Sequence, residues 1–253
     1  MAAECKINHG VTDAISSIKF SPVDPGLLAI SSWDKVLFLI QSVTCLDIVA
    51  NTQIKKFYHQ QAVLDISYSP DGAIVYSGGL DRQLVSNSLG RGDQSVIGSH
   101  EDAIRSIVTD QPHGRVVSGS WDKSVSFWDP RNNQQNATDH LELPGKVFTM
   151  DLACNMLVVG MAGRHVHIFD VRKLAKALLE KESPLKFQIR KIACIPSGEG
   201  YATSSIDGRV SVEHFDPADA AKQFAFKCHR KKADGAEYIY PVNALCYHPM
   251  YFS

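Results

Sequence analysis

The stretch Ser118-Gly119-Ser120-Trp121-Asp122 decides the fold, because related phrases recur along the whole chain. The aligned last positions are 34, 81, 122, 163 and 207, so successive steps are 47, 41, 41 and 44 residues. A period of roughly 40 to 45 residues is typical of a repeat made of four short strands. The related phrases are Ser31-Ser32-Trp33-Asp34, Ser77-Gly78-Gly79-Leu80-Asp81, Val159-Gly160-Met161-Ala162-Gly163 and Ser204-Ser205-Ile206-Asp207-Gly208.

The third unit shows most clearly how one repeat is built. Residues 104–108 alternate apolar and polar side chains, residues 116–119 form a short run of small and apolar residues, and residues 125–128 alternate again. Trp121-Asp122-Lys123 supplies the turn between the second and third of these runs. The pattern predicts an all-β chain built from the four-stranded blades of a WD40 β-propeller.

The predicted propeller is a single domain over residues 1–253, and it is incomplete. About five blades and one further strand, at residues 242–247, are present. Such an open ring leaves sheet edges unpaired, and those edges invite aggregation unless they are covered. The chain is then a truncated isoform, an incomplete gene model or a protein that pairs with another to close its ring. The repeats lie roughly at residues 10–50, 58–92, 99–131, 144–172 and 186–217, with the start of a sixth at 240–247.

Two segments depart from the regular pattern. The first unit needs fourteen positions from Trp33 to Asp47, where the third needs eight from Trp121 to Asp129. The first unit therefore carries about six extra residues, and its unbroken apolar run at 36–40 is either fully buried or an insertion. Residues 171–181 have leucines at helical spacing, which predicts a short amphipathic insertion between blades.

The composition favours a soluble, intracellular protein. The chain is 44% hydrophobic and has a net charge of −1, so it lacks the basic excess of a general nucleic-acid or membrane binder. Its longest apolar run is far shorter than a membrane span, and no signal pattern precedes it. The cysteines have no ligand spacing, so we expect reduced, mostly buried thiols with no disulfide, metal or cofactor. They are Cys5, Cys45, Cys154, Cys194, Cys228 and Cys246.

Four residues of the third unit form the pattern of a structural hydrogen-bond relay: His100, Ser118, Asp122 and Trp128. Histidine, serine and aspartate together also allow a hydrolase, but a triad needs an exposed nucleophile and an oxyanion hole. Ser118 is predicted to be buried in a strand, and the chain has no G-x-S-x-G elbow. We therefore expect a network that holds the blade in register rather than a catalytic site.

Further phrases are spread over most of the chain: Ala62-Val63-Leu64-Asp65, Trp128-Asp129-Pro130-Arg131, Phe226-Lys227-Cys228-His229-Arg230 and Tyr240-Pro241-Val242-Asn243. Together with the repeats above, they resemble the "budding uninhibited by benzimidazole" mitotic-checkpoint propeller family, with residues 38–45 as the exception. The resemblance implies a seven-bladed propeller that binds a segment of checkpoint kinases and a phosphorylated kinetochore peptide. The related messenger-RNA export propeller of the nuclear pore is similar too, but Leu80, Glu213 and Pro241 favour the checkpoint branch.

Trp33 and Trp121 are predicted to contact a partner from one face of the propeller. Both stand in turns, one residue before the repeat aspartate, whereas the relay residue Trp128 stands in a strand. Tryptophan is enriched among interface hot spots. The alternative is that each ring packs on its own blade or the next.

Residues 186–232 are locally positive in a near-neutral chain. Arginine binds two oxygens of a phosphate or carboxylate at once, and lysine acts as a point charge. The resemblance implies that five basic residues contact the acidic or phosphorylated segment; the alternative is a solvated positive face, to which Lys231 and Lys232 are assigned. The five are Lys186, Arg190, Arg209, Lys227 and Arg230.

Together these features predict a non-enzymatic spindle-assembly-checkpoint scaffold that works in the nucleus and at kinetochores. It recruits checkpoint kinases through a short acidic segment and binds a phosphorylated scaffold peptide, without a cofactor or membrane. The alternatives are a nuclear-pore messenger-RNA export adaptor, which would favour single-stranded RNA, and a truncated, non-functional isoform. The sequence leaves open which kinase is preferred.

Overall fold

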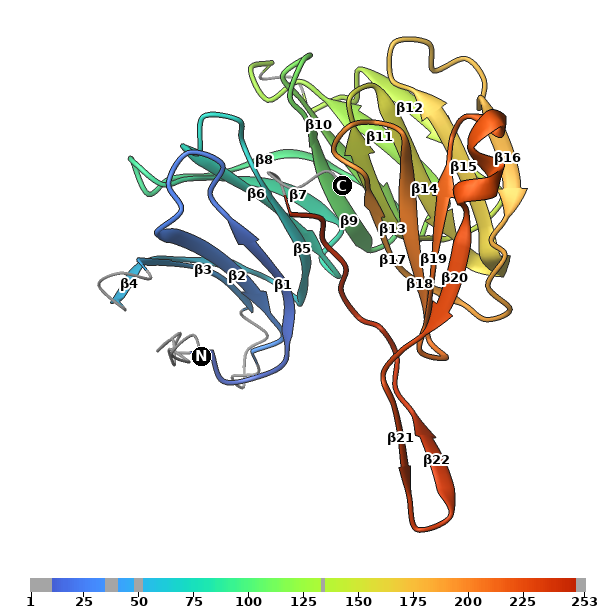
Figure 1. The fold of residues 1–253 in the computed structure, drawn as a ribbon. Helices are drawn as coiled ribbons and strands as arrows, with labels where there is room; N and C mark the ends of the chain where they lie inside the picture. The colour runs from blue at the N-terminus through green and yellow to red at the C-terminus, as the bar shows by residue number, and fades with distance from the viewer. Residues whose placement is uncertain (1–10, 35–40, 48–51, 133–134, 249–253) are drawn as a thin grey trace. The chain divides into compact units, whose positions relative to one another are not determined.

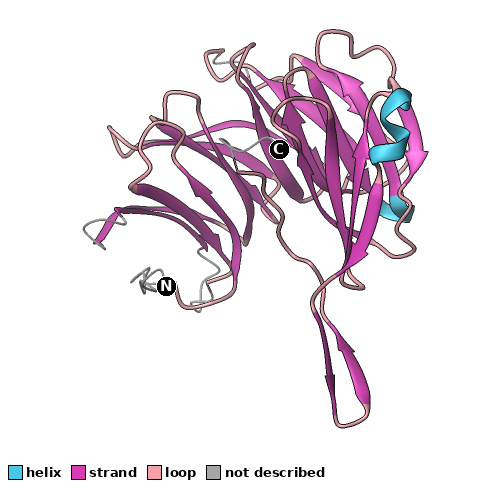
Figure 2. Ribbon diagram, in the orientation of Figure 1, coloured by secondary structure: helices cyan, strands magenta, loops and turns pink. Residues whose placement is uncertain are grey.

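The structure, a computed structural model, describes residues 11–34, 41–47, 52–132 and 135–248. Within these ranges nearly all regular structure is β-strand, with two short 3-10 helices, as Figure 2 shows. The strands form five antiparallel four-stranded sheets and one two-stranded hairpin. The predicted all-β class with four-stranded blades is confirmed. The chain forms two compact units, Met1–His140 and Leu141–Ser253, and each is described by itself.

Unit 1 contains three sheets, and in each the strands follow one another in chain order (Figure 1). The third begins at residue 104 and runs into β12, which crosses the boundary to unit 2. The strands are β1 (Ile15–Phe20), β2 (Leu27–Ser32), β3 (Gln41–Asp47) and β4 (Thr52–His59); β5 (Val63–Tyr68), β6 (Ile74–Gly79), β7 (Gln83–Ser88) and β8 (Gln94–Ser99); and β9 (Ile104–Asp110), β10 (Arg115–Ser120), β11 (Ser124–Trp128) and β12 (Asp139–Glu142).

Unit 2 contains two sheets of the same form and the hairpin, which extends away from the second of them in Figure 1. Its first sheet includes the short helix η1 (Ala162–Arg164), and η2 (Pro217–Lys222) follows the third strand of the second. The strands are β13 (Val147–Ala153), β14 (Met156–Met161), β15 (His165–Asp170) and β16 (Leu179–Glu182); β17 (Ile189–Cys194), β18 (Gly200–Ser205), β19 (Arg209–His214) and β20 (Phe224–Lys227); and β21 (Arg230–Ala233) with β22 (Ala236–Ile239).

The core of each unit lies between neighbouring sheets. In unit 1 one buried cluster joins the first and second sheets through Phe57 and Ile66, and another joins the second and third through Leu84 and Ile107. A glycine of the repeat phrase permits this close contact: a Cβ on Gly78 would lie 2.9 Å from the Ile104 side chain. The repeated small residues are therefore explained by sheet-on-sheet packing.

Unit 2 repeats the same arrangement between its two sheets. Val158, Ile168, Ile189 and Ile192 are buried together, and Gly160 stands where Gly78 stands in unit 1. A Cβ on Gly160 would lie 2.7 Å from the Ile192 side chain. The apolar runs of the sequence thus supply the buried inner strands, whereas the outer strands β12, β16 and β20 are mostly exposed.

The prediction of a short amphipathic insertion at residues 171–181 was wrong, because the segment forms no helix. The chain turns after β15 and enters β16 at Leu179, whose Cα partner is Ile168. The Leu178 N–H donates to the Ile168 carbonyl at 2.8 Å, and both leucines are exposed. A segment this short needs tertiary burial of an apolar face to stay helical. The open edge of β15 offers backbone partners instead.

The further strand expected at residues 242–247 is also absent, because no strand is assigned between Ile239 and His248. One backbone bond and one side-chain bond join this segment to β18: the Val242 N–H donates to the Ser205 carbonyl at 3.3 Å, and the Val242 carbonyl accepts from the Ser204 hydroxyl at 2.8 Å. Val242 is buried against Ala202 and Val210. Two such bonds do not make a ladder, so this segment packs on the sheet without extending it.

The extra residues of the first unit lie around the connection from β2, which ends at Ser32, to β3, which begins at Gln41. The apolar run at 36–40 lies outside the described residues. In the third unit the matching connection, from Ser120 to Ser124, is much shorter.

Candidate functional site

The residue before each repeat aspartate position occupies an equivalent place in all five sheets. Its N–H donates to the carbonyl of a residue just before the first strand of the same sheet, so the repeat phrase corresponds to one turn geometry. In unit 1 the bonds are Trp33 to Ala14 (2.9 Å), Leu80 to Ala62 (2.8 Å) and Trp121 to Ala103 (2.9 Å). In unit 2 they are Ala162 to Lys146 (2.9 Å) and Ile206 to Gln188 (3.1 Å).

The two turn tryptophans of unit 1 differ in their surroundings. Trp33 is 38% exposed, so its ring can be reached from solvent. Trp121 is half-buried and packs, with Leu80, against a small cluster that includes Ala62 and Ala103. The Trp121 ring therefore packs on the neighbouring sheet, as the alternative interpretation expects. Contact of either tryptophan with a partner stays a prediction.

The four predicted relay residues of the third sheet are joined by hydrogen bonds. His100 Nε2 lies 2.7 Å from Ser118 Oγ, His100 Nδ1 lies 2.9 Å from Asp122 Oδ2, and Trp128 Nε1 donates to Ser118 Oγ at 2.7 Å. Ser124 adds a hydroxyl bond to Asp122 at 2.6 Å. Burial alone would raise the pKa of Asp122, but the bonds from His100 and Ser124 outweigh it and lower the pKa well below its usual 3.8.

This geometry gives Ser118 a structural environment rather than a catalytic one. Its side chain is fully buried, and its hydroxyl is occupied by both the His100 and Trp128 rings. A nucleophilic serine must reach a substrate. The chain of bonds links the turn of Asp122 to the interior strands β10 and β11 and fixes their register.

The second sheet has an equivalent network in which Asn87 replaces the tryptophan. His59 Nδ1 lies 2.8 Å from Asp81 Oδ2, and His59 Nε2 lies 2.6 Å from Ser77 Oγ. Asn87 Nδ2 donates to Ser77 Oγ at 2.8 Å. In the sequence, this unit has His59 and Asp81 of the relay pattern but no tryptophan. The aligned spacing from Ser77 to Asn87, the same as from Ser118 to Trp128, was the available signal.

In unit 2, the predicted basic residues gather at one end of the second sheet. Arg209 begins β19 and is the Cα partner of Lys227, which ends β20, so the two side chains share a sheet face. Arg190 follows the first residue of β17, whose Cα partner is Ser205, at the same end of the sheet. The topology therefore places these cations around the turn that contains Asp207.

Asp207 is the internal anion of this cluster. Arg209 Nε lies 2.8 Å from Asp207 Oδ2. Arg230 Nη2 donates to the Asp207 carbonyl at 2.8 Å and lies 3.8 Å from Oδ2, while Arg230 Nη1 reaches Glu237 at 3.4 Å. The repeat phrase contains Asp207, but nothing in that phrase marks it as a partner for these arginines. The pairing orients both guanidinium groups.

The other predicted cations of unit 2 stand more freely in solvent. Lys186, Arg190 and Lys227 are exposed, and Arg190 Nε donates to Asn243 Oδ1 at 2.9 Å. Asn243 belongs to the segment that packs on the sheet after the hairpin. The five predicted basic residues thus belong to one unit, and the two tryptophans belong to the other.

Glu213, which favoured the checkpoint branch in the sequence, is buried. Its Oε2 accepts from Lys181 Nζ at 2.7 Å, and the same ammonium lies 5.3 Å from the centre of the Tyr201 ring. Burial, and then the Glu213 charge, raise the pKa of Tyr201 far above its usual range. Glu213 therefore joins the two sheets of unit 2 and does not present its carboxylate to a partner.

The described side chains contain no group of three or more His, Cys, Asp or Glu residues that could hold a metal ion. Of the six cysteines, Cys154, Cys194, Cys228 and Cys246 are described and free, and Cys194 alone among these four is buried, so the expectation of mostly buried thiols was wrong. Across the described ranges, no helix is long and apolar enough to cross a membrane.

The sheets and their repeated turn define a WD-repeat protein. The family model for the WD domain, G-beta repeat, matches residues 51–85 and 93–129. The chain is 38% identical to "Mitotic checkpoint protein BUB3.1" of Arabidopsis thaliana over 252 residues, which is 97% of this chain and 72% of the relative.

Two further relatives cover both branches that the sequence suggested. Identity is 36% with "Mitotic checkpoint protein bub3" of Dictyostelium discoideum, over 95% of this chain and 71% of the relative. Identity is 34% with "Poly(A)+ RNA export protein" of Schizosaccharomyces pombe, over 94% of this chain and 67% of the relative. The chain belongs to the family of BUB3 mitotic checkpoint WD-repeat proteins, to which the messenger-RNA export proteins are related.

Proposed function

We propose that the protein is a checkpoint scaffold that binds acidic and phosphorylated peptide segments without catalysing a reaction. The observation that carries the proposal is the cluster of cations around Asp207 in unit 2, with Arg209 and Lys227 as direct cross-strand partners. An incoming phosphate carries more negative charge than one carboxylate and offers three acceptor oxygens. It can therefore bind to guanidinium groups that Asp207 already orients.

The proposed partners follow from this chemistry and from the family. One is a short acidic segment of a checkpoint kinase, and the other is a phosphothreonine peptide of a kinetochore scaffold. Lys186, Arg190 and Arg230 extend the cationic surface around the Arg209–Lys227 pair. Trp33 in unit 1 supplies an exposed aromatic anchor for the same class of extended ligand. The proposed place of action is the nucleus and, in mitosis, the kinetochore.

The test is direct binding of the purified chain to a phosphothreonine peptide and to its unphosphorylated form, by calorimetry. We expect phosphate to tighten binding and Arg209→Ala or Lys227→Ala to remove most of that gain, about 10-fold or more, because hydrogen bonds to charged groups contribute about 1.5 to 3 kcal/mol. The matched control is Lys222→Ala: this lysine belongs to the same unit but is paired with Asp219 at 2.9 Å. Equal affinity for the two peptides would refute the proposal.

The export branch of the family supplies a second candidate function, the binding of single-stranded RNA. It is favoured by the relationship to the Schizosaccharomyces pombe protein, and the same cations could contact a nucleic-acid backbone. A poly(U) oligonucleotide in the same calorimetric series separates the two functions. Tight RNA binding that ignores peptide phosphorylation would favour export.

A further inference from the structure

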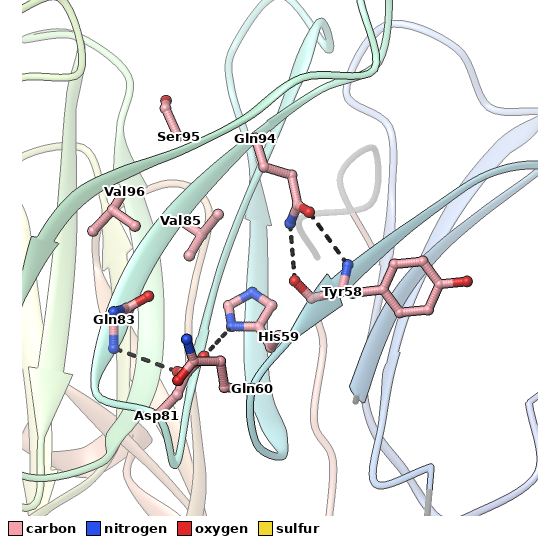
Figure 3. Close-up of a pocket in the computed structure, with 9 residues that line it drawn as sticks. All are labelled: Tyr58, His59, Gln60, Asp81, Gln83, Val85, Gln94, Ser95 and Val96. Carbon is pink, nitrogen blue, oxygen red and sulfur yellow. Dashed lines mark hydrogen bonds and ion pairs between the residues drawn. The ribbon is translucent and has the colours of Figure 1, made fainter. Parts of the chain in front are cut away.

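A groove opens in unit 1 between β4, the outer strand of the first sheet, and strands β7 and β8 of the second. Its cavity volume is about 170 Å³. Figure 3 shows the lining side chains, which come from the end of β4 and from β7, β8 and the turn before β7. They are Tyr58, His59, Gln60, Asp81, Gln83, Val85, Gln94, Ser95 and Val96.

The groove is polar but offers no unpaired charge to a ligand. Its histidine and its carboxylate, His59 and Asp81, have buried side chains that are bonded to each other at 2.8 Å. The accessible polar side chains of the lining include the carboxamides of Gln60, Gln83 and Gln94. Such a surface accepts neutral hydrogen-bonding groups and has no cation to attract a phosphate or carboxylate.

The Gln94 side chain crosses this groove and acts as a substitute for a neighbouring strand. Its Nε2 donates to the Tyr58 carbonyl at 3.2 Å, and its Oε1 accepts from the Tyr58 N–H at 3.5 Å (Figure 3). A carboxamide that bonds both backbone groups of one residue has the pattern of a peptide unit in a β-ladder. The Tyr58 backbone groups therefore point to the open edge of β4 rather than to β3.

Both contacts to Tyr58 are longer than the 2.9 to 3.0 Å typical of such hydrogen bonds, so they are weak and open to exchange. Gln94 has a shorter bond to Asn87 Oδ1, at 2.8 Å, which would hold its side chain after displacement. The cavity is also smaller than the roughly 300 Å³ from which pockets for small molecules begin. An extended chain that runs along an edge needs no deep pocket.

We infer that this groove binds an extended, uncharged segment of a partner protein, which pairs with the edge of β4 at Tyr58 and displaces the Gln94 carboxamide. The internal carboxamide shows the ligand chemistry: a peptide group, or an asparagine or glutamine side chain. Main-chain bonds supply affinity, and the half-buried side chain of Val96, beside its cross-strand partner Val85, favours a small aliphatic residue of the ligand. The site uses no residue of the phosphate-binding proposal.

The test is an NMR titration of the full chain with the probe peptide acetyl-Thr-Gln-Val-Gln-Val-Gln-Thr-amide. We expect the Tyr58 amide and the Gln94 side-chain amide to shift in parallel. Gln94→Ala should strengthen binding by about 2- to 10-fold, because it removes an internal competitor whose hydrogen bonds contribute about 0.5 to 1.5 kcal/mol. Tyr58→Pro should abolish binding, and β4 tolerates it because this N–H takes no part in the ladder to β3.

A second probe protects the test against a variant that fails to fold. The same peptide with its central backbone nitrogens methylated keeps every side chain but cannot pair along an edge, so it should not bind the unaltered chain. Lys227→Ala is the control variant, and it should bind the first probe as the unaltered chain does. The inference is overturned if the methylated probe binds equally, or if the first probe shifts neither amide in the unaltered chain and does not shift the Tyr58 amide in Gln94→Ala.

Discussion

Ser118 bonds two buried rings with one hydroxyl. It lies 2.7 Å from His100 Nε2 and accepts from Trp128 Nε1 at the same distance, in a fully buried position. Both rings are buried, so each of these nitrogens depends on this oxygen. The cost of losing it is the desolvation of two polar groups rather than the small net gain of one hydrogen bond.

Ser118→Ala should therefore lower the free energy of unfolding by about 2 kcal/mol or more. Urea unfolding followed by fluorescence measures this, since Trp128 reports on the same site. Ser95→Ala is the control, because Ser95 is exposed and its hydroxyl bonds only to Ser86 at 2.9 Å. That change should stay within about 0.5 kcal/mol. Equal midpoints for the two variants would contradict a structural role for the relay.

The depressed pKa of Asp122 makes the relay sensitive to acid. The folded pKa lies below the usual 3.8, so the folded state favours the carboxylate. The stabilisation is complete above the unfolded pKa of about 3.9 and is lost as pH falls through the folded value. The Asp122→Asn variant lacks this titration. We expect the stability difference between the unaltered chain and the variant to shrink from pH 6 to pH 3, measured by urea unfolding at each pH; a constant difference would argue against the assigned bonds.

At the scale of elements, strand β8 packs closely against Trp128, a relay residue of the next sheet. A Cβ on Gly98 would lie 2.0 Å from the Trp128 ring, so strand β8 approaches β11 as closely as glycine allows. Gly98→Ala should push Trp128 away from Ser118 and cost about 1 to 3 kcal/mol.

Gly90→Ala is the matched control for that prediction. Gly90 lies in the turn between β7 and β8, and a Cβ there would meet nothing within 4 Å. Its stability should change by no more than about 0.5 kcal/mol. Near-ultraviolet circular dichroism should change for Gly98→Ala alone. An unchanged spectrum for that variant would show that the close packing of β8 is not needed to hold the Trp128 ring in place.

The elements that the sequence predicted are those whose signal is local and repeated. The third unit shows it best: runs at 104–108, 116–119 and 125–128 correspond to β9, β10 and β11. The failures have a different cause. Leucines at helical spacing in residues 171–181 had no core to pack on, and residues 242–247 had no ladder partner. Both depend on what lies beside the segment, which a single segment does not encode.

In the candidate site too, the features with a local sequence signal were predicted, and those that depend on contacts with other elements were not. The turn positions of Trp33 and Trp121 followed from the repeat phrase, whereas the packing of Trp121 against the Ala103 cluster is a contact between sheets. Arg209 lies only two residues after Asp207, yet their pairing was not predicted, because an acidic residue in a repeat turn suggests a structural cap. Gln94 gave no signal, since nothing in its neighbourhood marks a glutamine as a bridge to β4.

At the scale of the whole molecule, charge separates the two candidate functions. The chain has a net charge of −1, and the proposed phosphate contacts use only a few cations of unit 2. A protein that contacts six to ten nucleic-acid phosphates loses about 10³- to 10⁵-fold in affinity between 50 and 200 mM salt. A peptide with one phosphate on Arg209, Lys227 and Arg230 involves fewer charges and partly desolvated pairs, which salt screens less.

We therefore expect phosphopeptide affinity to fall by about 10-fold or less between 50 and 200 mM salt, as measured by fluorescence anisotropy. A poly(U) oligonucleotide in the same buffers is the comparison, and its binding should be weak and lost steeply. Lys222→Ala should change the salt dependence of neither affinity, since that lysine is already paired with Asp219. A phosphopeptide that loses three orders of magnitude would show that binding is diffuse attraction to a polyanion, and the RNA-binding branch would then explain the cations of unit 2 better.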